Sequence, residues 1–72
     1  MTLNDLPEKD SATIHAIGGN PVARQQLREL GLVPGDTVRV LRRAAMGGPL
    51  LVECRGTQIA LGRNIARQVI VE

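Results

Sequence analysis

Turn residues divide the second half of the chain into short segments with the spacing of β-hairpins. Pro34-Gly35, Gly47-Gly48-Pro49 and Gly56-Thr57 bound segments that are rich in Val, Leu and Ile, and such segments are typical of antiparallel strands. In a chain of 72 residues, a sheet of short strands protects its edges best by curling into a barrel. We therefore expect strands at residues 37–43, 50–55, 58–61 and 68–71.

One helix with clear start and stop signals is expected before these strands. Asn20 is a strong N-cap and Pro21 suits the first helical position, while Gly31 suits the left-handed position that follows a helix. These signals predict a helix over about residues 21–30, with a first strand at 12–17 before it. The apolar stripe of the helix, at helical spacing, consists of Ala23, Leu27 and Leu30. The sequence thus predicts a single, mainly β domain over residues 1–72, with about five strands and one helix between the first and second strands.

Composition limits how such a domain is stabilised and what it binds. The chain has no Phe, Trp or Tyr, so Val, Ile and Leu must build the core. Nucleic-acid readers that stack bases on aromatic side chains are therefore disfavoured. The net charge of +2 permits contact with acidic partners but does not require nucleic acid. Cys54 is the only cysteine, so no disulfide forms within the chain.

Localisation is expected to be cytoplasmic. No segment approaches the run of about 20 apolar residues that crosses a bilayer. Residues 1–10 carry acidic side chains and no apolar stretch, unlike a secretory signal. A lone cysteine also suits a reducing compartment.

The residues that carry reactive side chains do not form a recognisable site. His15 alternates with Ile14 on the expected first strand and is predicted to face solvent; a single histidine supports at most weak or intermolecular binding of a divalent metal. Cys54 shares a strand face with Leu50 and Val52, which favours a small buried hydrophobe over a reactive thiolate. Neither residue has an evident catalytic partner, so we expect no enzyme activity, no cofactor and no small-molecule substrate.

Surface features are the remaining candidates for function. Leu41 and Leu51 fall on the outward phase of their strands, and Met46 lies in a glycine-rich loop. A contiguous cluster of this kind marks an interface, and arginines could frame it. The candidate partner-binding residues are Leu41, Met46, Leu51, Arg42, Arg43 and Arg55. In the alternative, Leu41 and Leu51 pack beneath the helix or the N-terminal segment.

Residues 27–40, which read Leu-Arg-Glu-Leu-Gly-Leu-Val-Pro-Gly-Asp-Thr-Val-Arg-Val, are similar to the signature of the ferrous iron transport protein A (FeoA) family. In that signature a helix ends in Leu-Gly-Leu and is followed by Pro-Gly and a strand. Gly48-Pro49-Leu50 matches the family's entry into its third strand. Residues 2–6 resemble the family's opening, and residues 59–63, Ala66 and 69–71 resemble its closing stretch.

The resemblance implies an SH3-like β-barrel with a role in bacterial ferrous iron uptake. The family works beside FeoB, a membrane permease with a cytoplasmic G domain, so the implied function is an accessory protein that docks on the permease's cytoplasmic face. Two alternatives stay open: a divalent-metal-sensing or metal-carrying protein, and a regulatory domain of the kind that ends iron-dependent repressors. Weak self-association is also left open.

Overall fold

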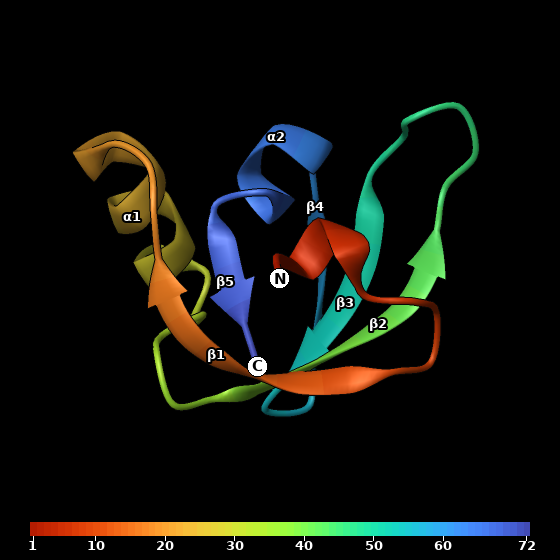
Figure 1. The fold of residues 1–72 in the computed structure, drawn as a ribbon, viewed down its shortest axis with the longest axis horizontal. Helices are drawn as coiled ribbons and strands as arrows, with labels where there is room; N and C mark the ends of the chain where they lie inside the picture. The colour runs from red at the N-terminus through yellow and green to blue at the C-terminus, as the bar shows by residue number, and fades with distance from the viewer.

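Five antiparallel strands form one sheet in the computed structural model, which describes residues 1–72. The strands are β1 (Ser11–Ile17), β2 (Thr37–Arg43), β3 (Leu50–Cys54), β4 (Thr57–Leu61) and β5 (Val69–Val71). Their order in the sheet is β4-β3-β2-β1-β5. The sheet curls so that its two outer strands face one another across the core (Figure 1). This is the expected mainly β, SH3-like barrel.

β1 bends the sheet because it pairs with different neighbours along its two halves. Its first half pairs with β2, where Ala12 opposes Val38, and its second half pairs with β5, where Ile17 opposes Val69. The register shifts between Ile14 and Ala16, and an irregularity of this kind bends and twists a strand. Ile14, which alternates with the exposed His15, is fully buried, while Ala12 and Ala16 are half-buried.

The helix α1 (Pro21–Glu29) lies between β1 and β2 and has the expected caps. The Asn20 side chain accepts a hydrogen bond of 2.8 Å from the backbone N–H of Ala23. At the other end, Gly31 has φ +91°, its N–H donates to the Arg28 carbonyl, and the Leu32 N–H donates to the Leu27 carbonyl. These two hydrogen bonds form a Schellman motif.

This motif changes which leucine reaches the core. The predicted stripe included Leu30, but Leu30 is the C-cap residue and is 39% exposed. Leu32, which follows the left-handed glycine, is buried in its place beside Leu27. The helical periodicity failed here because the helix ends at Glu29, one residue before Leu30.

A tight turn connects the end of this motif to β2. The Asp36 N–H donates to the Val33 carbonyl at 3.2 Å, and Gly35 has φ +98°, as the type II turn at Pro34-Gly35 requires. The Gly35 N–H also donates to the Ile14 carbonyl at 2.8 Å. The turn is therefore joined directly to the bend of β1.

The core is aliphatic apart from Cys54. Fifteen buried residues form one cluster, and no buried residue is polar or charged. The N-terminal 3₁₀ turn η1 (Leu3–Asp5) contributes Leu3, which the sequence analysis had not assigned to an element, and the short helix α2 (Arg63–Ala66) contributes Ala66. The helical turn α2 connects β4 to β5 at the upper side of the molecule in Figure 1. No helix of the structure has the length and apolar character that a bilayer-spanning helix needs.

The left-handed residue Gly31 gives a direct test of this account. No atom lies within 4 Å of where a Cβ would stand, so Gly31→Val meets backbone strain without a clash. We expect a loss of about 1–2 kcal/mol. For a domain of this size, each kcal/mol lowers the melting temperature by about 4–8 °C.

Gly18→Ala is the matched control. Its Cβ would meet ordinary contacts of 3.7 Å or more at a backbone conformation open to other residues, so its melting temperature should stay close to that of the wild type. Equal melting curves for Gly31→Val and the wild type would contradict the left-handed helix stop.

Candidate interaction surfaces

The predicted interaction patch lies partly at one end of the β2–β3 hairpin. Met46 is fully exposed in the loop between these strands and has φ +59°. On the next part of the hairpin, Arg42 stands opposite Leu51, and Leu51 stands opposite Ala60 of β4. Leu41 is the extra residue of a bulge in β2. Leu41 and Leu51 are both half-buried, so they are neither core residues nor free surface.

The other two predicted residues point to different parts of the molecule. Arg43 stands opposite the buried Leu50, and its guanidinium donates to the Leu6 carbonyl at 2.9 Å. Arg55 lies in the β3–β4 turn at φ +55° and forms an ion pair with Asp36, with 2.9 Å between Nη2 and Oδ1. The structure thus brings Leu41, Arg42 and Leu51 together near the Met46 loop, while Arg43 and Arg55 have structural partners elsewhere.

Sequence reasoning missed the residue that supports the Met46 loop, Arg63. The Arg63 side chain donates from Nε to the Gly48 carbonyl at 2.7 Å and from Nη2 to the Ala44 carbonyl at 3.0 Å. Both bonds are partly buried, and Ala44 also donates its N–H to the Pro49 carbonyl at 3.1 Å. The loop is therefore held at both ends. The available signal was an arginine at the first position of a helix, where a positive charge opposes the helix dipole.

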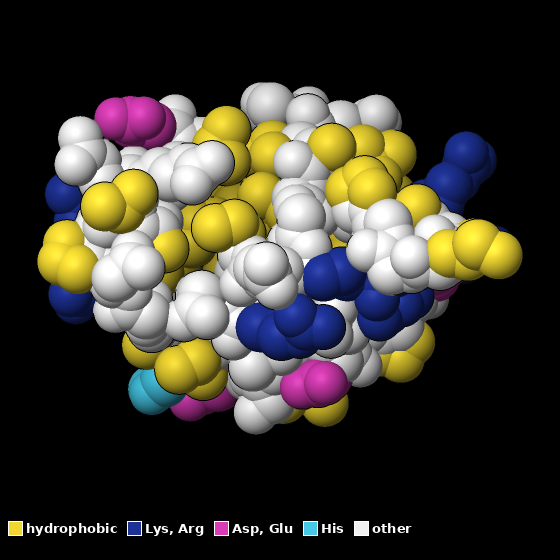
Figure 2. All heavy atoms as spheres, turned by 90° about the horizontal axis from the view of Figure 1, so that it is seen from above, with side chains coloured by type: hydrophobic (Ala, Val, Ile, Leu, Met, Phe, Trp, Pro, Cys, Tyr) yellow, Lys and Arg dark blue, Asp and Glu magenta, His cyan; other side chains and the backbone are white.

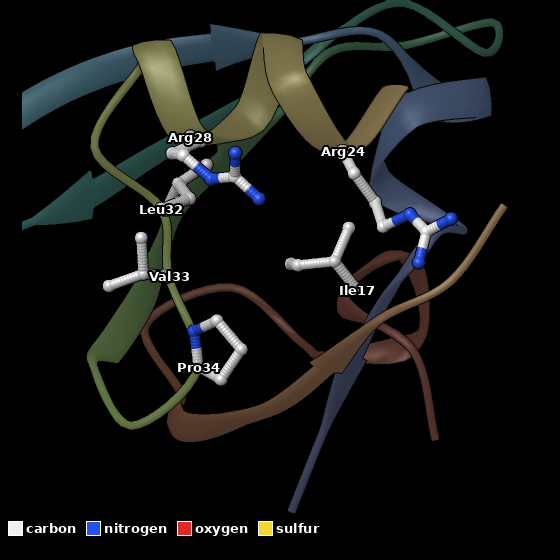
Figure 3. Close-up of a pocket in the computed structure, with 6 residues that line it drawn as sticks. All are labelled: Ile17, Arg24, Arg28, Leu32, Val33 and Pro34. Carbon is white, nitrogen blue, oxygen red and sulfur yellow. The ribbon is translucent and has the colours of Figure 1, made fainter. Parts of the chain in front are cut away.

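A second site, which the sequence analysis did not identify, is a pocket of about 140 Å³ beside α1. The end of β1, the face of α1 and the segment that follows its Schellman motif line it. Figure 3 shows the Arg24 and Arg28 side chains descending from the helix on either side of the Ile17 side chain, opposite Pro34. The lining residues are Ile17, Arg24, Arg28, Leu32, Val33 and Pro34.

The arginines of the chain fall into two groups. Five of the eight have a hydrogen-bond or ion-pair partner within the chain: Arg39, Arg43, Arg55, Arg63 and Arg67. The other three are Arg24, Arg28 and Arg42, and all three are exposed. Two of the three unpaired arginines thus line the pocket, and the third, Arg42, stands opposite Leu51 in the β2–β3 ladder. Figure 2 shows hydrophobic side chains exposed across one face between α1 and the β2–β3 loop, with basic side chains gathered at its lower right.

His15 and Cys54 lie in very different environments. His15 is exposed, as expected, and its Nδ1 lies 2.8 Å from Oε1 of Glu72. Cys54 is 4% exposed. Burial raises the pKa of its thiol, and the nearby charge of Asp36 raises this pKa further. No three His, Cys, Asp or Glu residues are grouped where they could bind one metal ion.

Five antiparallel strands curled around one core, with one capped helix between β1 and β2, define the class: a small SH3-like barrel. The FeoA domain model matches residues 1–72. The chain therefore belongs to the FeoA domain family, which confirms the resemblance seen in its sequence.

Known relatives agree with this assignment. A Fe(2+) transport protein A/Fe(2+) transporter FeoB fusion protein of Porphyromonas gingivalis is 31% identical over the whole chain, which spans 8% of the fusion protein's length. The crystal structure of Stenotrophomonas maltophilia FeoA complexed with zinc, described as an SH3 domain protein, is 37% identical, with a TM-score of 0.87 over 100% of this chain and 89% of that one. A manganese-dependent transcriptional repressor shares the fold, at 21% identity and a TM-score of 0.88, over all of this chain and 41% of its own. The family link is thus to Fe(2+) transport.

The raised pKa of Cys54 predicts a pH dependence. The thiol ionises more readily in the unfolded chain than in the folded one, so folded stability is complete below the unfolded pKa and falls as pH rises above about 8.5. Chemical denaturation between about pH 7 and about pH 10, a range that brackets the unfolded pKa of roughly 8.5, should show a steeper decline in the unfolding free energy for the wild type than for Cys54→Ala. Parallel declines would contradict a buried neutral thiol.

The placement of His15 predicts weak metal binding. Its one carboxylate neighbour is Glu72, and a closed divalent site needs more ligands. Calorimetric titration of the monomer with Zn²⁺ or Fe²⁺ should give no tight stoichiometric site. A submicromolar site that is lost in His15→Ala and weakened in Glu72→Gln would overturn this expectation and favour a metal-carrying function.

Proposed function

We propose that this chain is a protein-interaction module of ferrous iron uptake that acts in the cytoplasm on the G-domain permease of the FeoB type. The docking surface in this proposal is the β2–β3 end, formed by Met46 at the loop tip and by Arg42 and Leu51 beside it. The observation that carries the proposal is a fully exposed methionine on a loop that Arg63 fixes at two carbonyls.

The chemistry of this surface suits a protein partner. Ordering a mobile loop on binding costs free energy, and a loop already held in place avoids much of that cost. A methionine adapts its shape to the pocket it enters, which makes Met46 a suitable apolar anchor. Arg42 has no partner within the chain and stands opposite Leu51, so it can serve as a charged rim that steers an acidic surface.

The fusion protein of Porphyromonas gingivalis supports the choice of partner. In that protein a region similar to the whole of this chain is covalently joined to an FeoB transporter. A covalent link gives two modules a high effective concentration, and such linkage is useful where the modules act together. By analogy, we assign the same partner to this chain.

The metal-carrying alternative has a narrower basis. The Stenotrophomonas maltophilia FeoA structure is complexed with zinc, and His15 with Glu72 provides two ligand atoms on the surface of this chain. Two such ligands fit a weak site shared between molecules better than a site for metal delivery.

Replacing the loop-tip methionine tests the docking proposal. Because Met46 makes no buried contact, Met46→Ala should change the unfolding free energy by less than about 0.5 kcal/mol. As an interface anchor it should weaken binding to the permease's cytoplasmic domain by about 2 kcal/mol, measured by calorimetry or biolayer interferometry. Leu51→Ala should also weaken binding.

Val22→Ala is the matched control, because Val22 is an exposed apolar residue on α1, away from the hairpin. It should bind like the wild type. If Met46→Ala and Leu51→Ala both retain wild-type affinity, the permease docks elsewhere. If Leu51→Ala loses several kcal/mol of stability, Leu51 belongs to the core.

A further inference from the structure

The pocket beside α1 combines two unpaired positive charges with an apolar lining. Arg24 and Arg28 are one helical turn apart and are both exposed. Like charges at this spacing repel one another. The only acidic residue of α1, Glu29, accepts a hydrogen bond from Gln25 at 3.3 Å and is not among the residues that line the pocket. No acidic side chain of the chain itself therefore neutralises the pair.

The rest of the pocket is apolar and small. Ile17, Val33 and Pro34 line it from β1 and the turn before β2 (Figure 3). Its volume of about 140 Å³ is well below the roughly 300–1,000 Å³ of sites that enclose a cofactor or drug-sized ligand. A single aliphatic side chain fits this space, and guanidinium groups on either side match carboxylates through paired N–H donors.

We propose that this pocket binds an extended acidic segment of a partner protein, with an aliphatic side chain in the pocket and carboxylates on Arg24 and Arg28. In an extended segment, alternate side chains point the same way, so the pattern acid-x-aliphatic-x-acid presents all three groups to the pocket. This site is separate from the Met46 surface and does not depend on the identity of the partner that Met46 contacts.

Charge and lining favour a peptide over other anions. A phosphate ion would leave the apolar lining unused. An anionic membrane needs a broad basic surface, whereas only Arg24 and Arg28 supply positive charge at this pocket and the net charge of the chain is only +2. A carboxylate-bearing peptide uses both halves of the pocket.

The test is an NMR titration of the ¹⁵N-labelled chain with the peptide acetyl-Glu-Ser-Leu-Ser-Glu-amide. We expect chemical shift changes centred on Ile17, Arg28 and Val33, with weak affinity. Two control peptides separate the contributions: one replaces both glutamates by glutamine, and the other replaces the leucine by serine. Each should bind about tenfold more weakly, because the first lacks the carboxylates that bind the arginines and the second lacks the aliphatic side chain that fills the pocket.

Variants of the helix complete the test. Arg24→Gln with Arg28→Gln should weaken peptide binding by about tenfold or more, while the double lysine variant keeps the charge and should retain part of the affinity. Arg39→Gln, at an exposed position of β2 outside this pocket, is the control and should bind like the wild type. The exposed helix positions 24 and 28 accept glutamine without loss of helix propensity.

Several results would overturn the proposal. Shift changes that are the same for the glutamine peptide, or that persist in the double glutamine variant, would exclude carboxylate recognition. Equal changes with inorganic phosphate would indicate a simple anion site, and binding to phosphatidylglycerol vesicles without peptide binding would indicate a membrane contact. Concentration-dependent line broadening of the free chain that disappears in the double glutamine variant would identify a second copy as the occupant. The titration contains no permease, so its failure leaves the Met46 surface to be judged on its own assay.

Discussion

The pairing of β1 with two different neighbours is the constraint on which the rest of the structure depends. β1 pairs with β2 at Ser11–Thr13 and with β5 from Ile14 to Ile17, so it links the β2–β3–β4 part of the sheet to the closing strand. The register shift after Ile14 lets the second half of β1 turn toward β5 and closes the sheet around an aliphatic core. The Gly35 and Ile14 N–H groups join this bend to the turn before β2, since Gly35 donates to the Ile14 carbonyl and Ile14 donates to the Asp36 carbonyl. The bend, the helix stop at Gly31 and the start of β2 therefore form one unit, and the pocket beside α1 lies on it.

Features set by neighbouring residues could be predicted from the sequence, and those set by distant contacts could not. The strands at residues 37–43 and 50–55, the cap at Asn20 and the left-handed Gly31 all depend on local backbone preferences, and the structure has them at or within a few residues of the expected positions. Leu30 was assigned to the apolar stripe because helical periodicity assumes that the helix continues through this residue. In the structure the helix ends at Glu29 and Leu30 is its C-cap. The bulge at Leu41 could not be predicted from strand alternation either. An extra residue in a strand changes which side chains share a face.

The candidate sites show the same division. The exposure of Met46 could be predicted because a glycine-rich loop exposes its tip, which is a local property. The role of Arg63 depends on carbonyls of residues 15 and 19 positions earlier in the chain, and the pocket combines residues from β1, α1 and the following turn. No local sequence pattern predicts contacts between residues that are this far apart in the chain. Arg43 and Arg55 were grouped with the patch by strand phase alone, whereas their actual partners, the Leu6 carbonyl and Asp36, come from other segments.

Net charge is a poor guide to how this molecule uses its arginines. The value of +2 describes a nearly balanced surface, yet the eight arginines have two distinct uses. Those at positions 39, 43 and 63 donate to backbone carbonyls, which joins segments in a chain that has no disulfide and no aromatic side chain. Arginine suits this task because its planar fork reaches two acceptors at once. The three that remain without partners lie on the two surfaces to which we assign binding. Because the core has no polar side chain, guanidinium groups outside it supply directional contacts between segments, and those not used within the fold are available for recognition.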